Sequence, residues 1–405
     1  MRTPLEGVRI LDLSHALAGP FCSTMLADFG AEVIKLEPTE TGDIARAWGT
    51  RLPSGAGTTY FASLHRGKQS IEIDLKQARG KELFWRLVEK CDAVLENYRA
   101  GVLEKLGLGY EAARRRHPGI IYCSISGFGQ DGPYRDRAAL DLILQAESGM
   151  ISVTGEPDGP GVRCGVSIAD MTAGMYAAFG IVAALRVKEK TGKGQAIDVS
   201  MLEGQLSLLQ TMIAAYLVDG AVPGPMGTAY KALLPYQTFR TKSRDLALAV
   251  GSEKLWKIFC PVIGRPDLTD DPRYRTNADR ERNRASLIAT LQEAFLTKTY
   301  QEWEALLLAS GIPVGAINTL AEVLDHPQVK ARNAIFEVEH PVTGPVKMVG
   351  VPIRMSETPG AVRGPAPLLG EHTDDVLDRV LGLTEAERAS LRAAGVIGGG
   401  PPAGR

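Results

Sequence analysis

The feature that most constrains this chain is a regular alternation of strand-like and helix-like segments in its N-terminal third. Short apolar runs typical of buried strands occur at 7–14 (GVRILDLS), 31–37 (AEVIKLE), 68–76 (KQSIEIDLK), 92–98 (DAVLENY) and 119–126 (GIIYCSIS). Helical patterns separate several of them, at 15–30 and 81–91. Parallel strands require such crossover segments. The pattern therefore predicts an α/β fold with a doubly wound, Rossmann-like large domain.

The remainder of the chain indicates a second, smaller domain. Helical segments rich in Ala, Gly and Ser begin at Asp170, and a Gly/Pro-rich stretch follows at 219–227. We predict that residues 1–220 belong to the large domain, 221–230 form a linker and 231–330 form a smaller α+β domain. This smaller domain would open with a hairpin at 236–251. Thr384 and Glu387 have the spacing of a helix capping box, and the tail at 396–405 is predicted to be disordered.

Composition excludes several function classes. The 46 basic and 47 acidic residues leave a net charge of −1, which favours neither nucleic acid nor an anionic membrane as a partner. The five cysteines form no C-x-x-C pair and the six histidines show no metal-ligand spacing, so we expect no metal and a reducing compartment. No signal peptide and no run of roughly 18 apolar residues is present, which favours the cytoplasm.

Two short motifs leave more than one interpretation open. Gly127, Gly129 and Gly132 match the G-x-G-x-x-G dinucleotide pattern, but no helix follows at once to receive a pyrophosphate, so a glycine-rich turn near a ligand is favoured. Residues 97–105 gather Asn97, Tyr98, Arg99 and Lys105 after a strand. This segment is either a solvated loop or a site for a ligand that carries phosphate and adenine.

Asp170 poses the sharpest question, because it stands at the start of a long apolar segment. On local grounds alone, the favoured interpretation is a helix N-cap, a position where Asp is among the best residues. Capping does not exclude chemistry. The helix dipole would favour the ionised carboxylate, and carboxylates are among the side chains that form covalent intermediates.

Seven segments in one order resemble the class III CoA-transferase family, which includes the formyl-CoA, carnitine and dicarboxylate CoA-transferases. They include ILDLSHALAGPFCSTMLADFGAEVIKLE at 10–37, VLENYRAGVLEKLGLGYE at 94–111 and SIADMTAG at 167–174; the others lie at 41–49, 60–76, 120–134 and 190–203. As a whole the motifs look most like the dicarboxylate members, which use succinyl-, glutaryl-, itaconyl- or mesaconyl-type substrates. The resemblance implies an acyl-CoA:carboxylate CoA-transferase with coenzyme A thioesters as substrates.

The resemblance assigns roles by position. Asp170 matches the family's catalytic aspartate, which carries an acyl anhydride and then a CoA thioester. The positions expected to contact coenzyme A are His15, Ala16, Leu17, Ala18, Arg46, Ile73, Lys76, Asn97, Tyr98, Arg99 and Lys105. The expected acyl-pocket residues are Leu140, Asp141, Arg163, Lys231 and Arg240. The resemblance also implies an interlocked homodimer, with residues 331–395 returning to complete a discontinuous large domain.

Three departures from the family pattern narrow the expected reaction. Leu17 replaces the Gln of formyl-CoA transferases, and the stretch at 225–239 lacks their glycine run, so formyl or oxalyl chemistry is disfavoured. Leu140 stands where transferases usually have Tyr and α-methylacyl-CoA racemases have His. A leucine cannot exchange protons, which disfavours the racemase alternative. A non-catalytic CoA-binding protein of the same fold remains the third alternative.

Overall fold

The computed structural model describes residues 3–52 and 57–399, and they divide into two compact units. The large unit comprises the described parts of 1–150, 163–221 and 328–405, and the small unit comprises 151–162 and 222–327. Residues 151–162 belong to the small unit, which corrects the expectation of an uninterrupted large domain from 1 to 220. The large unit is nevertheless discontinuous, because residues beyond 327 return to it.

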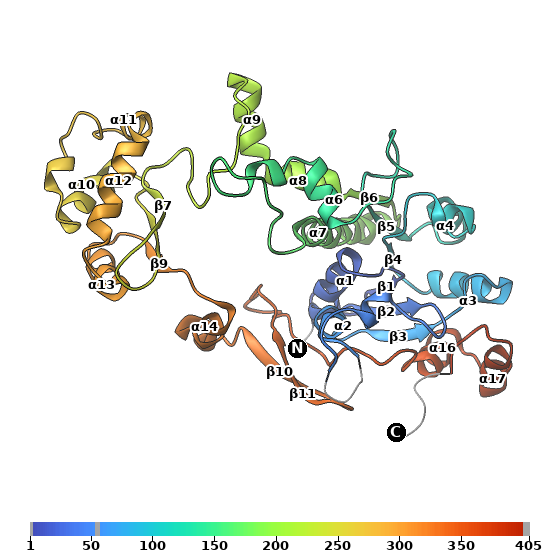
Figure 1. The fold of residues 1–405 in the computed structure, drawn as a ribbon. Coiled ribbons are helices and arrows are strands. Elements are labelled where there is room, and N and C mark those ends of the chain that lie inside the picture. Colours follow the sequence, from blue (N-terminus) through green and yellow to red (C-terminus); the bar gives the residue numbers. More distant parts are fainter. Residues whose placement is uncertain (1–2, 53–56, 400–405) are drawn as a thin grey trace. The chain divides into compact units, whose positions relative to one another are not determined.

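A six-stranded parallel sheet forms the centre of the large unit, in the order β3-β2-β1-β4-β5-β6 (Figure 1). This is the strand order of doubly wound dinucleotide-binding folds. The strands are β1 (Arg9–Asp12), β2 (Glu32–Glu37), β3 (Gln69–Glu72), β4 (Ala93–Glu96), β5 (Ile121–Ser126) and β6 (Ala196–Ser200). All five strands predicted in the N-terminal third are present, which confirms the α/β prediction for this region.

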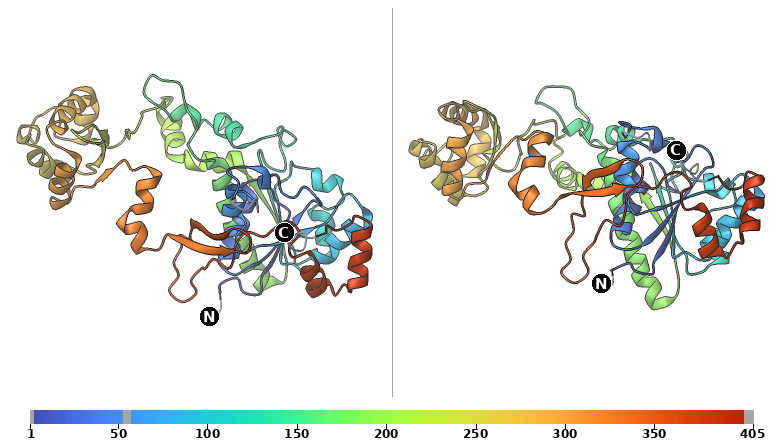
Figure 2. Two further views of the ribbon diagram at one scale, coloured as in Figure 1. Left: turned by 60° about the horizontal axis from the view of Figure 1, so that its bottom comes forward. Right: turned by 90° about the horizontal axis from the view of Figure 1, so that it is seen from below.

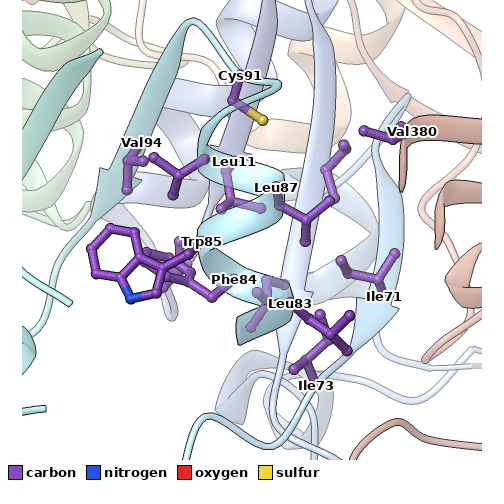
Figure 3. Close-up of a cluster of buried hydrophobic side chains, with 14 of the residues drawn as sticks. Leu11, Ile71, Ile73, Leu83, Phe84, Trp85, Leu87, Cys91, Val94 and Val380 are labelled. Atoms are coloured by element: carbon purple, nitrogen blue, oxygen red, sulfur yellow. The ribbon is translucent and has the colours of Figure 1, made fainter. Parts of the chain in front are cut away.

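Helices cover both faces of this sheet. On one face α3 (Ala78–Val88), α5 (Tyr110–Arg116), α16 (Thr373–Leu381) and α17 (Glu385–Ala393) enclose a core. Figure 3 shows part of this core, with side chains of α3 and Val380 of α16. On the other face the core contains residues of α1 (Ala18–Asp28) and α7 (Ile168–Thr191). Ile10 points into the second core and Leu11 into the first, as the alternation of a strand buried on both faces requires.

The C-terminal segment completes the first of these cores. Val396 and Ile397 are buried in it, and Ile397 pairs with Ile73 beside β3. Residues 396–399 are therefore folded, which corrects the prediction that the tail begins at 396; residues 400–405 lie outside the described part. Two further views show α16 and α17 beside the N-terminal elements of the large unit (Figure 2). The predicted capping box is confirmed, with Thr384 and Glu387 bonded reciprocally at the start of α17.

The remaining elements of the large unit include a hairpin and several short helices. The hairpin pairs β10 (Ile335–His340) with β11 (Gly344–Val349). The helices are η1 (Ile44–Ala47), α2 (Thr59–Leu64), α4 (Val102–Lys105), α6 (Asp141–Glu147), α8 (Met201–Leu208) and α9 (Gln210–Asp219), and α15 (Pro327–Ala331) begins where the chain re-enters this unit.

The small unit packs helices on a three-stranded sheet of order β7-β8-β9. The predicted hairpin is confirmed as the antiparallel pair β7 (Tyr236–Phe239) and β8 (Leu246–Ala249). The other elements are η2 (Ile151–Val153), α10 (Glu253–Val262), η3 (Pro266–Leu268), α11 (Asn277–Arg282), α12 (Arg284–Phe295), α13 (Tyr300–Ala309), β9 (Val314–Ala316) and α14 (Leu320–Asp325).

Among the described residues, α7 is the one helix with the length and composition to cross a membrane. Half of its most apolar 18-residue window is buried inside the protein. Its small residues explain that burial: a Cβ added at Gly174 would lie 2.6 Å from the carbonyl oxygen of Ala18 in α1. The helix ends at Thr191 and is followed by Gly192, whose φ of 70° suits a glycine C-cap.

Candidate functional site

A tight turn at residues 14–17 follows β1, at the carboxyl edge of the sheet where doubly wound folds bind ligands. Asn97, which follows the adjacent strand β4, accepts a hydrogen bond from the His15 backbone N–H and donates one to the His15 carbonyl, both at 2.8 Å. Ala16 has a φ of 64°, which is uncommon for a residue with a Cβ. Leu17 then occupies the N-cap of α1. Pro20 is the third residue of this helix.

A cavity of about 510 Å³ opens beside this turn. Its lining residues are His15, Tyr98, Arg99, Ala100, Val102, Lys105 and Asp136. Four of the residues predicted to contact coenzyme A are thus brought together, and Asn97 supports one of them. The rings of His15 and Tyr98 meet edge to face, with centroids 5.0 Å apart. Burial lowers the pKa of His15 despite the opposing charge of Asp43, so the imidazole is neutral near pH 7 and Arg99 and Lys105 supply the positive charge.

Three other positions from the predicted coenzyme set lie in different surroundings. Arg46 is already paired: it binds the buried Glu37 through two hydrogen bonds of 2.7 and 2.8 Å and covers the ring of Phe61. The side chain of Ile73 is fully buried in the core, so it is inaccessible to a ligand. Lys76 is exposed beyond β3. Only Lys76 of these three could offer an uncommitted charge.

Asp170 is the third residue of α7, and the structure shows that its predicted role as the N-cap is wrong. Ser167 occupies the N-cap position and makes no side-chain capping bond. The carboxylate that satisfies this helix end comes from another helix: Asp141 in α6 accepts the backbone N–H of Ala169 at 2.9 Å. Asp170 therefore does not cap α7, and its carboxylate is not needed to satisfy this helix end.

Asp141 is held in place by two further side chains. Gln145, one helical turn later in α6, donates to its Oδ2 at 2.7 Å, and the Arg163 guanidinium lies 3.7 Å from the same oxygen. Asp141 is buried, whereas the neighbouring Leu140 is 72% exposed. Of the predicted acyl-pocket residues, Asp141 and Arg163 are therefore adjacent, and Leu140 precedes them at the start of α6.

The pKa of Asp170 is raised to about 7, first by burial and then by the negative charge of Asp141. The sequence had suggested that the helix dipole would favour ionisation, but desolvation and like charge outweigh it. Burial, followed by the charges of Asp170, Asp43 and Asp141, also raises the pKa of Tyr60 to about 12. Tyr60 thus keeps its proton near the two acids. A group with an environment of this kind is a candidate for function.

Packing of α7 on α1 connects Asp170 to the turn beside the cavity. Gly174 contacts Ala18, the first residue of α1, so closely that no larger residue fits. Asp170 is four residues earlier on α7 and therefore on the same face of the helix. After burial, the charges of Asp170 and Asp43 both raise the pKa of Tyr60, and Asp43 also accepts the backbone N–H of Ala16. Tyr60 therefore lies near both Asp170 and the turn. The acid and the turn belong to one region of the large unit.

Comparison with known proteins now decides the family. Residues 5–373 match the family model "CoA-transferase family III". The chain belongs to this CoA-transferase family. It is 40% identical to succinyl-CoA:glutarate CoA-transferase of Mus musculus, over 97% of this chain and 90% of that protein. It is 39% identical to succinyl-CoA–D-citramalate CoA-transferase of Chloroflexus aurantiacus, over 97% and 98%.

Solved structures agree with this family assignment. A CaiB/BaiF family protein from Brucella suis has a TM-score of 0.83 and 36% identity, covering 94% of this chain and all of that one. The resemblance found in the sequence is therefore confirmed, and this protein is an enzyme of the CoA-transferase type. The CoA-transferase relatives above are named for succinyl-CoA with glutarate or D-citramalate, which are dicarboxylic acids.

Sequence reasoning missed several residues of this candidate site. Gln145 had a usable signal, since it follows Asp141 by four residues on a helix. Tyr60 and Asp43 had none, because their proximity depends on the fold. Lys231 and Arg240, predicted for the acyl pocket, are exposed residues of the small unit. Among the residues described here, no three His, Cys, Asp or Glu side chains gather as a metal site would require.

Proposed function

We propose that this enzyme moves CoA from an acyl-CoA donor to a free dicarboxylic acid, with Asp170 as the covalent carrier. The observation that carries the proposal concerns the Asp170 carboxylate, which is partly buried, does not cap its own helix and has a pKa of about 7. It lies on the helix face that meets the turn beside the cavity. A CoA-transferase needs a nucleophile and a coenzyme site in the same region, and fixed geometry can supply several kcal/mol of the barrier reduction.

The proposed reaction starts with attack of the Asp170 carboxylate on the donor thioester carbonyl. The C–S bond breaks, CoA leaves as the thiolate, and a mixed anhydride remains on Asp170. The thiolate then attacks the aspartyl carbonyl, which releases the donor acid and leaves an aspartyl-CoA thioester. The acceptor carboxylate displaces CoA from this thioester to form a second anhydride. The thiolate finally attacks the acceptor's acyl carbon, giving the new acyl-CoA and free Asp170.

The cavity offers the contacts that coenzyme A requires. Arg99 and Lys105 would bind phosphate oxygens, and Tyr98 with the neutral His15 would contact the adenosine or pantetheine. Lys76 could contribute a further cation. We exclude Arg46 from direct phosphate binding, because Glu37 already neutralises it. Backbone N–H groups in the glycine-rich segments are suitable donors to the oxyanion of each tetrahedral step.

Arg163 is the residue that we propose for recognition of the substrate's second carboxylate. Its side chain is about half exposed and meets Asp141 at 3.7 Å, beyond the length of a good hydrogen bond. An incoming carboxylate could replace this weak contact. The small-unit residues Lys231 and Arg240 remain further candidates. Leu140, exposed at the start of α6, would contribute apolar surface to the acyl pocket.

We also propose that the enzyme is a cytoplasmic, interlocked homodimer that binds neither nucleic acid nor a membrane. Large apolar side chains are exposed on the large unit, including Phe179 at 74%, Leu217 at 75% and Val218 at 89%. Exposed apolar patches mark interaction sites, and a second copy of the chain is the partner that the family resemblance implies. Light scattering after gel filtration tests this point: a monomeric mass at micromolar concentration contradicts it.

Mass spectrometry of the protein mixed with acyl-CoA tests the catalytic proposal. Succinyl-, glutaryl-, itaconyl- and mesaconyl-CoA would each be added, and the intermediates trapped with hydroxylamine or borohydride. We expect modification at Asp170 with at least one donor and none in Asp170→Asn. Unmodified wild-type protein across the panel, with coenzyme binding intact, would overturn the mechanism and leave the non-catalytic alternative. Uptake of deuterium at the α-carbon without any acceptor acid would instead indicate a racemase.

A further inference from the structure

Beneath the turn beside the cavity lies a buried cluster of charged groups that the proposed reaction does not use. Lys35 in β2 and Asp43, the N-cap of η1, form an ion pair of 2.9 Å with both side chains almost fully buried. His65 lies 3.7 Å from the same Asp43 oxygen, and Lys68 contacts both His65 and Asp12. Such a cluster costs desolvation energy that apolar residues of equal size would not incur.

The ion pair bonds directly to the backbone of the turn. The Lys35 ammonium donates to the carbonyl of Ser14. The Asp43 Oδ1 accepts the backbone N–H of Ala16 at 3.1 Å and that of Ala45 at 2.9 Å. Lys35 and Asp43 thus hold the two peptide groups that flank His15, and their own attraction fixes the separation between those contacts.

The conformation of the turn explains why it needs such support. Ala16 has a left-handed φ of 64°, a state that costs a non-glycine residue on the order of 1 kcal/mol or more. The neighbouring Gly19 packs directly against the turn, because a Cβ added there would lie 2.1 Å from the Cβ of Ser14. A strained turn persists only where its surroundings fix it.

We propose that Lys35 and Asp43 are positioning residues for coenzyme binding: their buried ion pair holds the strained turn so that the His15 ring packs edge to face against Tyr98 at the cavity. This inference rests on the proposed coenzyme site. Neither residue lines the cavity, so each acts through the turn. Loss of the pair removes the bonds to Ser14 and Ala16 and leaves those of Asn97 to His15, so His15 is then held less firmly against Tyr98.

Isothermal titration calorimetry with CoA tests the proposal. The Kd for CoA is measured for the wild type, Lys35→Met, Asp43→Asn and the double variant. Loss of one or two supporting hydrogen bonds should raise the Kd for CoA about five- to thirtyfold. At saturating acyl-CoA the turnover number should change less than the KM, because Asp170 belongs to another element. The double variant leaves no unpaired buried charge, so it keeps the test usable if Lys35→Met does not fold.

The control is a second buried ion pair away from the turn, Arg66 with Asp28, whose shortest contact is 2.6 Å. Asp28→Asn should lower thermal stability as Asp43→Asn does, while the Kd for CoA stays within twofold of the wild-type value. Equal CoA affinity in the wild type and in every Lys35 and Asp43 variant that folds would overturn the positioning role. Equal weakening by Asp28→Asn would assign the effect to general destabilisation. Wild-type protein that binds no CoA would instead refute the coenzyme site itself.

Discussion

Replacement of Asp170 by Asn should make the protein more stable at alkaline pH, because the native state resists ionisation of this side chain. In the folded protein its pKa is about 7, against an ordinary value near 3.8. Between pH 3.8 and about pH 7 the folded protein therefore retains a proton that the unfolded protein has lost. The free energy of unfolding falls as the pH rises through this range. The difference corresponds to at most about 4 kcal/mol, at roughly 1.36 kcal/mol for each tenfold change in proton affinity.

Urea unfolding of the wild type and of Asp170→Asn at pH 5 and pH 8 measures this effect. Integrating the two pKa values gives a penalty for the wild type of about 1.7 kcal/mol at pH 5 and about 4 kcal/mol at pH 8. The advantage of the Asn variant should therefore grow by roughly 2–3 kcal/mol between the two pH values. Asp158→Asn, on an exposed turn of the small unit, is the matched control and should show no growth. An advantage that stays constant with pH would refute the argument that Asp170 is desolvated beside Asp141.

Three further predictions concern activity and packing. Asp141→Asn removes the second cause of the raised pKa of Asp170, so the acid limb of the pH–rate profile should move to lower pH; an unchanged limb would leave burial as its sole cause. Gly19→Ala forces a Cβ to within 2.1 Å of the Ser14 side chain and should destabilise the protein by about 1–3 kcal/mol, whereas a melting temperature equal to that of the wild type would show that the turn can move. Thr384→Ala removes an N-cap and should cost about 1 kcal/mol in urea unfolding, with no effect on CoA binding.

The sheet could be predicted from the sequence because its information is local. The central strands β1, β4 and β5 are buried along nearly their whole length and therefore appear as largely apolar runs. The right-handed crossover rule then leaves few topologies, and the observed order is one of the common ones. The assignment of residues 151–162 to the small unit had no comparable signal. It depends on contacts that these residues make far along the chain.

The misassigned role of Asp170 shows where local reasoning fails. A single Asp at a helix start is usually a cap, but a cap can also come from a neighbouring helix. Here Asp141 bonds the N–H of Ala169 from α6, 28 positions earlier in the chain. No spacing rule within one helix detects this arrangement. The same limit applies to Arg46: its charge was visible in the sequence, but its pairing with Glu37 required the packing of η1 beside β2.

In the proposed mechanism, the phosphates of coenzyme A bind at the cations Arg99 and Lys105, while the nucleophile is an acid on another element of the large unit. A near-neutral protein can bind phosphates only through local cations, and Arg99 and Lys105 lie together at the cavity. Burial, and then the negative charge of Asp141, raise the cost of ionising Asp170, as its pKa of about 7 reflects. A carboxylate with this pKa is a stronger base, and therefore a better nucleophile, than an ordinary aspartate, yet about half of it is ionised at neutral pH. The burial that destabilises the ionised Asp170 in the folded protein is thus the property that would suit it to the proposed role of acyl carrier.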